Sequence, residues 1–266
     1  MKGLLFGGCS FTWGQGLYYY SDLNRLPILE NEYDYHPELI NQSHLRFKDS
    51  IRYPRLVANH FNTFEVFKDN NGPSLGNGGS EDETFDFFDD IFKNQKFFYD
   101  DFEYIVIQLS YVYRNKFYYT NNNLIGSVIL NPMDGHFQQD TNDFKEYYVN
   151  SSMSFESIME EHLLQQYTRL KNKMLYYEGK GIKTKIISWQ DDLLDLIFSD
   201  EFTNSRFIKM EYDNKIVNTI KELMRLDNNK FTIECDLHFT KKILDNHPSK
   251  YCHKIIADSI IKNLTK

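Results

Sequence analysis

Short apolar runs alternate with helical patterns along the chain, and this alternation constrains the fold more than any other feature. The helical stretches lie between them, with apolar residues three and four positions apart. Such alternation predicts a three-layer α/β/α fold with a mostly parallel, flavodoxin-like sheet of about five strands. The predicted strands are residues 2–8, 63–69, 104–110, 183–190 and 231–235, and the predicted helices are residues 53–61, from about 81 onward, 155–177, 191–198, 212–226 and 249–264.

Ligands of open parallel sheets bind beyond the carboxyl ends of the strands. The predicted strands bring four segments to that edge, which are residues 8–12, 76–80, 110–114 and 189–191. Two long stretches without clear periodicity, residues 17–50 and 111–150, are rich in tyrosine and asparagine. We interpret the chain, residues 1–266, as one domain with these two stretches as insertions. We expect them to be ordered loops that wall the site.

Composition argues against several classes of function. The formal net charge is −8, with no dense cluster of lysine and arginine, so nucleic acid is not expected as a partner. No apolar stretch approaches the roughly 18 residues of a membrane span. The three cysteines lack metal-ligand spacing and are expected to be reduced thiols, as in the cytoplasm. No metal and no organic cofactor is expected.

Two segments contain candidate catalytic residues. Ser10 follows the first strand at a glycine-rich turn, where a hydroxyl can be exposed as a nucleophile. The alternatives are that Ser10 or Thr12 caps a helix, or that Cys9 is the nucleophile. Near the other end of the chain, His247 precedes Pro248 and the final helix, with Asp245 two residues before it.

Together these segments resemble the SGNH, or GDSL-type, hydrolase family over nearly the whole chain. Residues 8–11, "GCSF", resemble the first block of the family, in a divergent form often met in phage and bacterial genomes. "GNGGS" at residues 76–80 is similar to the second block, and "DNHPS" at residues 245–249 to the last. The resemblance implies that Ser10 is the nucleophile and His247 the base. Asp245 or a backbone carbonyl would orient the histidine, and Gly79, or Gly78 as second choice, would help to bind the oxyanion.

One block departs from the family pattern. The third block of the family carries an asparagine, but this chain has Gln108, Leu109, Ser110 and Tyr111 there, so Ser110 or Gln108 would have to substitute.

The expected function is a serine esterase that cleaves a small ester or the O-acetyl group of a carbohydrate. The alternative is an SGNH-fold scaffold or particle component, phage-encoded and virion-associated, with weak or no catalysis. It would bind protein or glycan and assemble, as a homo-oligomer for example, through its insertions.

Overall fold

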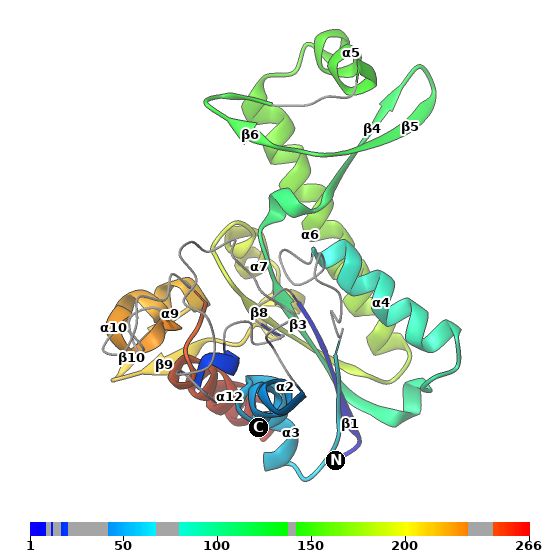
Figure 1. The fold of residues 1–266 in the computed structure, drawn as a ribbon. Coiled ribbons are helices and arrows are strands. Elements are labelled where there is room, and N and C mark those ends of the chain that lie inside the picture. The colour runs from blue at the N-terminus through cyan, green and yellow to red at the C-terminus, as the bar shows by residue number, and fades with distance from the viewer. Residues whose placement is uncertain (9–11, 13–16, 21–41, 68–79, 138–141, 234–246) are drawn as a thin grey trace.

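A four-stranded parallel sheet forms the centre of the molecule (Figure 1). The computed structural model describes residues 1–8, 12, 17–20, 42–67, 80–137, 142–233 and 247–266. Every neighbouring pair of strands in this four-stranded sheet is parallel. The strands, in their order across the sheet, are β2 (Glu65–Phe67), β1 (Gly3–Gly7), β3 (Phe102–Leu109) and β8 (Lys183–Ser188). The predicted α/β class is confirmed.

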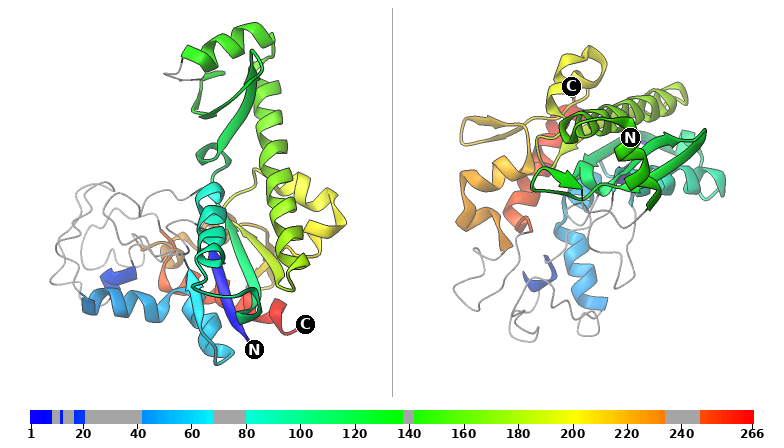
Figure 2. Two further views of the ribbon diagram at one scale, coloured as in Figure 1. Left: turned by 90° about the vertical axis from the view of Figure 1, so that its right-hand side faces the viewer. Right: turned by 90° about the horizontal axis from the view of Figure 1, so that it is seen from above.

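Helices cover both faces of this sheet, as Figures 1 and 2 show. Alternate side chains of β1 point to opposite faces, so Leu4 and Phe6 belong to one core and Leu5 to the other. The first core is closed by α3 (Tyr53–His60) and α12 (Lys250–Leu264). The second is closed by α4 (Glu81–Lys93), α6 (Phe155–Gly179) and α7 (Leu194–Ser199). Burial on both faces explains why β1 consists of apolar residues and glycine alone.

Residues 231–235 were predicted to form a fifth strand. Residues 231–233, the described part of this range, do not join the sheet, so the prediction is wrong for them. Phe231 ends the helix α10 (Asn228–Phe231), and Thr232 forms an isolated antiparallel bridge with Pro248. The outer edge of β8 pairs instead with two single residues, Phe207 and Thr219, through parallel bridges. Neither residue belongs to a strand, but the two bridges satisfy part of the backbone hydrogen bonding at the outer edge of β8.

A hairpin also occupies the start of the predicted helix at residues 212–226. Strands β9 (Met210–Tyr212) and β10 (Lys215–Val217) are antiparallel, and the helix α9 is limited to Ile220–Leu226. Asp213 and Asn214 connect the strands with φ angles of 50° and 61°. Two adjacent residues with positive φ are the requirement of a type I′ hairpin turn, which a helix cannot contain.

The stretch at residues 111–150 forms a small folded lobe beyond the carboxyl ends of the strands (Figure 1). Its own core includes Phe117, Tyr119, Phe144 and Ile158, the last from the first turns of α6. The expectation of irregular loops is therefore wrong for this stretch. The elements of the lobe are β4 (Lys116–Asn121), β5 (Leu124–Ile129), β6 (Pro132–Met133), β7 (His136–Phe137) and α5 (Asn142–Ser151).

The other predicted insertion, residues 17–50, contains two described helical segments. These are the 3₁₀ helix η1 (Leu17–Tyr20) and the helix α2 (Gln42–Ile51). Residues 21–41 lie outside the described residues. The prediction of a stretch without regular structure is thus corrected at its carboxyl end.

Candidate site at the carboxyl ends of the strands

The strand order places a topological switch point between β1 and β3. The chain passes from β1 to β2 on one side and then returns to β3 on the other side of β1. In open parallel sheets ligands bind at such a point, outside the carboxyl ends of the two strands. Gly8 follows β1 there, and Gln108, Leu109 and Ser110 lie at the end of β3.

A chain of buried hydrogen bonds joins Thr12 to the end of β3. The hydroxyl of Thr12 donates to the amide oxygen of Gln108 over 2.7 Å. The Oη atom of Tyr53 lies 2.8 Å from the same hydroxyl and therefore donates to it, because Thr12 has only one proton to give. The amide nitrogen of Gln108 donates to the carbonyl of Leu109 over 3.2 Å. These contacts fix Thr12, two positions beyond Ser10, against the end of β3.

Gly8 is required by this contact. A Cβ atom at position 8 would lie 2.2 Å from Oγ1 of Thr12 and 2.9 Å from Cβ of Gln108. No side chain fits in that space, so the close approach of Thr12 to the end of β3 depends on glycine at position 8.

Tyr53 also connects this turn to the carboxyl-terminal helix. Its backbone N–H donates to Nδ1 of His253 over 3.2 Å, and the two rings stack with centroids 5.6 Å apart. Tyr53 meets Phe6 edge to face, with centroids 6.0 Å apart. The first turns of α3 and α12 therefore meet at the carboxyl end of β1.

His247 lies just before α12 and is half-buried. Its backbone carbonyl accepts a hydrogen bond from the N–H of Ile233 over 3.0 Å, and the N–H of Ser249 donates to the carbonyl of Phe231 over 2.9 Å. The side chain of Ser249 caps α12 by accepting from the N–H of Cys252. The backbone from His247 to Ser249 is thus held in place, as Pro248 in a fixed turn predicts.

His253 is buried in the first turn of α12, six positions after His247. Burial, together with the charges of His247 and Arg52, lowers the pKa of His253 to about 3. Because Nδ1 of His253 accepts a hydrogen bond, its Nε2 carries the proton, and that N–H has no hydrogen-bond partner within the described part of the chain. His253 is thus a neutral, buried histidine that contacts Tyr53.

The described residue of the glycine-rich block is Ser80. Ser80, its last residue, is the N-cap of α4, where its hydroxyl accepts from the N–H of Glu83 over 3.2 Å. Asp82 in the first turn accepts from the N–H of Lys116 over 2.9 Å and forms an ion pair with Arg169. These contacts fix the start of α4 against the base of the lobe.

The predicted site residues divide into two groups. Gln108, Ser110 and His247 are described and lie at or near the carboxyl ends of the strands; the hydroxyl of Ser110 accepts from Nη1 of Arg114 over 3.3 Å. Ser10, Gly78, Gly79 and Asp245 lie outside the described residues, as does Cys9. The distance between Oγ of Ser10 and the ring of His247 therefore stays a prediction.

Sequence reasoning missed Tyr53 and His253 as residues of this site. A signal for His253 exists, because it shares the apolar face of the last helix with Ile256, Ala257 and Ile260, all buried. A histidine on such a face is buried and has to be kept neutral or paired. No sequence signal shows that Tyr53 is its partner, since the two are 200 positions apart.

Comparison with known proteins returned no match to any family model, curated protein or solved structure. Among the described residues, no cluster of three or more histidine, cysteine, aspartate or glutamate side chains has the geometry of a metal site. None of the described helices is both long and apolar enough to cross a membrane.

Proposed function

We propose that the protein is a serine ester hydrolase of the SGNH type, with O-acetyl groups on carbohydrate as the favoured substrate class. One observation carries the proposal. Thr12, two positions after Ser10, contacts Tyr53, and Tyr53 contacts His253, six positions after His247, at the carboxyl end of β1. A nucleophile and its base must meet from distant parts of the chain, and this linkage supports such a meeting.

In the proposed mechanism, Oγ of Ser10 attacks the ester carbonyl carbon while His247 takes the hydroxyl proton. The backbone N–H groups of Ser10 and Gly79 bind the oxyanion, with Gly78 as second choice for the glycine and Ser110 as a further donor. His247 then gives the proton to the leaving alkoxide, and an acyl-enzyme remains on Ser10. Water, deprotonated by His247, hydrolyses this intermediate. Asp245 or a backbone carbonyl orients the imidazole and supports its positive form.

Gln108 has a positioning role in this proposal. Its amide oxygen accepts from Thr12 and its amide nitrogen donates to Leu109. It therefore fixes Thr12, while Ser110 is left as the side-chain candidate for the missing asparagine of the third block. The loss of one oxyanion donor costs about a hundred- to a thousandfold in rate in other hydrolases, so a slow enzyme is expected.

A hydrolysis screen tests the proposal. Purified protein is incubated with p-nitrophenyl esters and with acetylated sugars, and released nitrophenol and acetate are measured. Ser10→Ala and His247→Ala should each reduce turnover by at least about a thousandfold. Ser127→Ala and His136→Ala, at exposed positions of the lobe, are the matched controls and should keep full activity. Activity that survives Ser10→Ala but is lost in Cys9→Ala would assign the nucleophile to Cys9 instead.

A second candidate function is assembly of a particle or scaffold through the lobe. Several large apolar side chains of the lobe are exposed, with fractions of 74% for Leu124 and 82% for Ile125 at the hairpin tip. Exposed apolar patches of this kind mark interaction sites in many proteins. Ile129 and Val149 are exposed on the same lobe.

A further inference from the structure

A cavity of about 610 Å³ lies at the opposite end of the sheet from the candidate site. It opens at the amino ends of β3 and β8, between the last turn of α6 and the end of α12. Four of its lining side chains carry positive charge, and we name it the basic cavity. These residues are Lys183, Lys185, Arg206 and Lys266.

The acidic lining residue Glu178 is already fully engaged. Its two carboxylate oxygens accept from Nε and Nη2 of Arg206, each over 2.6 Å. The hydroxyl of Thr184 donates to the same carboxylate over 2.6 Å. Burial raises the pKa of Glu178, but the bonds from Arg206 and Thr184 outweigh burial and hold it below its ordinary value. Glu178 is therefore ionised and balances one cation, which leaves the lysines in excess.

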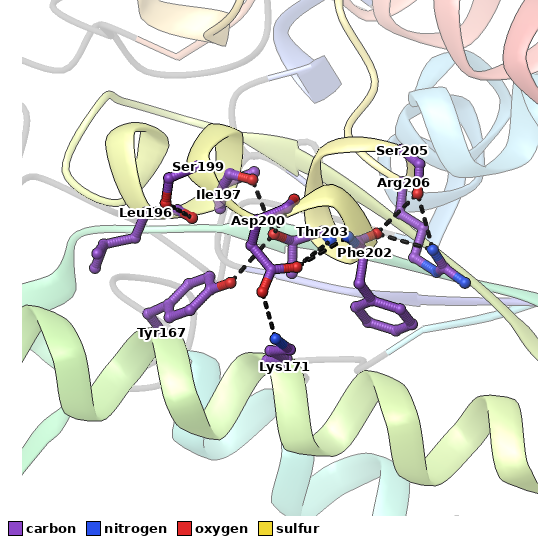
Figure 3. Close-up of polar contacts among 10 residues, drawn as sticks. All are labelled: Tyr167, Lys171, Leu196, Ile197, Ser199, Asp200, Phe202, Thr203, Ser205 and Arg206. Atoms are coloured by element: carbon purple, nitrogen blue, oxygen red, sulfur yellow. Dashed lines mark hydrogen bonds and ion pairs between the residues drawn. The ribbon is translucent and has the colours of Figure 1, made fainter.

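The contacts around the α7–α8 turn hold Arg206 in place (Figure 3). Nη1 of Arg206 donates to the carbonyl of Phe202 over 2.8 Å, and its guanidinium carbon lies 3.7 Å from the centre of the Phe202 ring. Asp200 caps the helix α8 (Glu201–Asn204) by accepting from the N–H of Phe202 over 2.9 Å, and forms an ion pair with Lys171 of α6. The wall of the basic cavity is thus a rigid part of the fold.

Lys185 is the residue of the basic cavity whose charge is least balanced. It is half-buried, and within the described residues its ammonium group has no hydrogen bond and no ion pair. Burial lowers the pKa of Lys185, and the positive charges of Arg206, Lys266 and Lys183 lower it further against the opposing effect of Glu178. Lys183, by contrast, lies 3.5 Å from a carboxylate oxygen of Glu103. A partly buried cation among like charges needs an anion.

We propose that the basic cavity binds a phosphate-type anion, either free phosphate or the phosphate group of a small molecule, with Lys185 as its central ligand. Lys183 and Lys266 complete the set of donors, and the side-chain amide of Asn263 lines the same cavity. A phosphate group suits a cavity lined by three lysines, because its charge and acceptor oxygens can form charge-assisted hydrogen bonds with ammonium groups. The cavity is separate from the candidate esterase site, and the proposal does not depend on the esterase function.

Calorimetric titration with sodium phosphate tests this proposal, with thermal unfolding as a second readout. The comparison is between the wild-type protein, Lys185→Met and the matched control Lys145→Met, which removes an exposed charge on α5 of the lobe. Methionine keeps the length of the lysine stem, so Lys185→Met should fold. We expect wild type and Lys145→Met to bind phosphate alike, and Lys185→Met to bind about ten- to a hundredfold more weakly. Lys183→Met serves as a second variant and should weaken binding less.

Two results would overturn the proposal. One is equal binding of phosphate by wild type and Lys185→Met. The other is a wild-type shift in unfolding temperature that sodium chloride reproduces at matched ionic strength, since that is general screening. Titration with a sugar phosphate and with phosphoserine distinguishes the two sources of the anion. Tighter binding of an organic phosphate than of inorganic phosphate would assign the rest of the 610 Å³ to its organic part.

Discussion

His162 and His253 are both buried and held neutral. Burial lowers the pKa of His162 to about 4 and that of His253 to about 3, whereas an exposed histidine titrates near 6.5. The Nε2 atom of His162 lies 3.1 Å from the carbonyl of Val112, at the base of the lobe. Below pH 6.5 the unfolded chain takes up protons at these two positions while the folded chain does not. Protons therefore favour the unfolded state between pH 6.5 and about 3 to 4.

This difference predicts a loss of stability in mild acid. Between pH 7.5 and pH 5 each histidine should lower the free energy of unfolding by about 1–2 kcal/mol. Urea unfolding at the two pH values measures this. His162→Gln keeps an N–H donor for the carbonyl of Val112 but does not titrate, so it should lose less stability on acidification than wild type. His136→Gln, at an exposed position of the lobe, is the control. Identical pH dependence in His162→Gln and wild type would contradict the account.

Gly7 allows α4 to pack against the centre of the sheet. A Cβ atom at position 7 would lie 2.1 Å from Cγ2 of Thr84 and 2.4 Å from Cζ of Phe88. Gly7→Ala should therefore destabilise the protein by about 1–3 kcal/mol in urea unfolding, the range for an overpacked core. Gly179→Ala is the matched control, because nothing lies within 4 Å of its added Cβ at the end of α6. A Gly7→Ala protein as stable as the control would show that α4 is not packed as described.

Among the elements, the lobe has two proposed roles, assembly of the protein and choice of substrate, and a substitution at its exposed tip can distinguish them. Trimming residues 118–142 would remove the partners of Phe117, Phe144 and Ile158, so it would expose a core as well as remove a surface. Leu124→Ser with Ile125→Ser changes the exposed hairpin tip alone. If the lobe assembles the protein, the double variant should lower the mass measured by light scattering and keep esterase activity. If the lobe sets substrate choice, the double variant should keep its mass and change its substrate profile. An unchanged mass together with an unchanged profile would mean that the tip has neither role.

The lobe was not predicted because aromatic side chains lie on both faces of its first hairpin. In β4, Phe117 and Tyr119 are buried while Tyr118 is 40% exposed, so the apolar and polar alternation that marks a strand is hidden. The central strands β1, β3 and β8 were predicted because they are buried on both faces and form continuous apolar runs. The helix α6 was predicted within two residues of its end because Gly179 and Gly181 follow the helical pattern.

For the molecule as a whole, the sequence predicted which residues lie at the carboxyl ends of the strands but not the contacts between them. Strand alternation places Gly8 and Ser110 at the carboxyl ends of neighbouring strands, which the structure confirms. Two other contacts, between Thr12 and Gln108 and between Tyr53 and His253, join residues 96 and 200 positions apart. Such pairs depend on how α3 and α12 pack side by side, which no local pattern specifies. The basic cavity was missed for the same reason, because its cations come from β8 and from the residues that follow α8 and α12.

The central claim is that Ser10 is a nucleophile activated by His247. Covalent labelling with a fluorophosphonate, followed by intact mass measurement and peptide mapping, tests it most directly, because the reagent reacts with activated serines whatever the natural substrate is. The account predicts one added phosphonyl group on Ser10 in wild type, in Ser127→Ala and in His136→Ala, and none in Ser10→Ala or His247→Ala. Labelling at another residue, or an unlabelled wild type that is folded and pure, would contradict the claim.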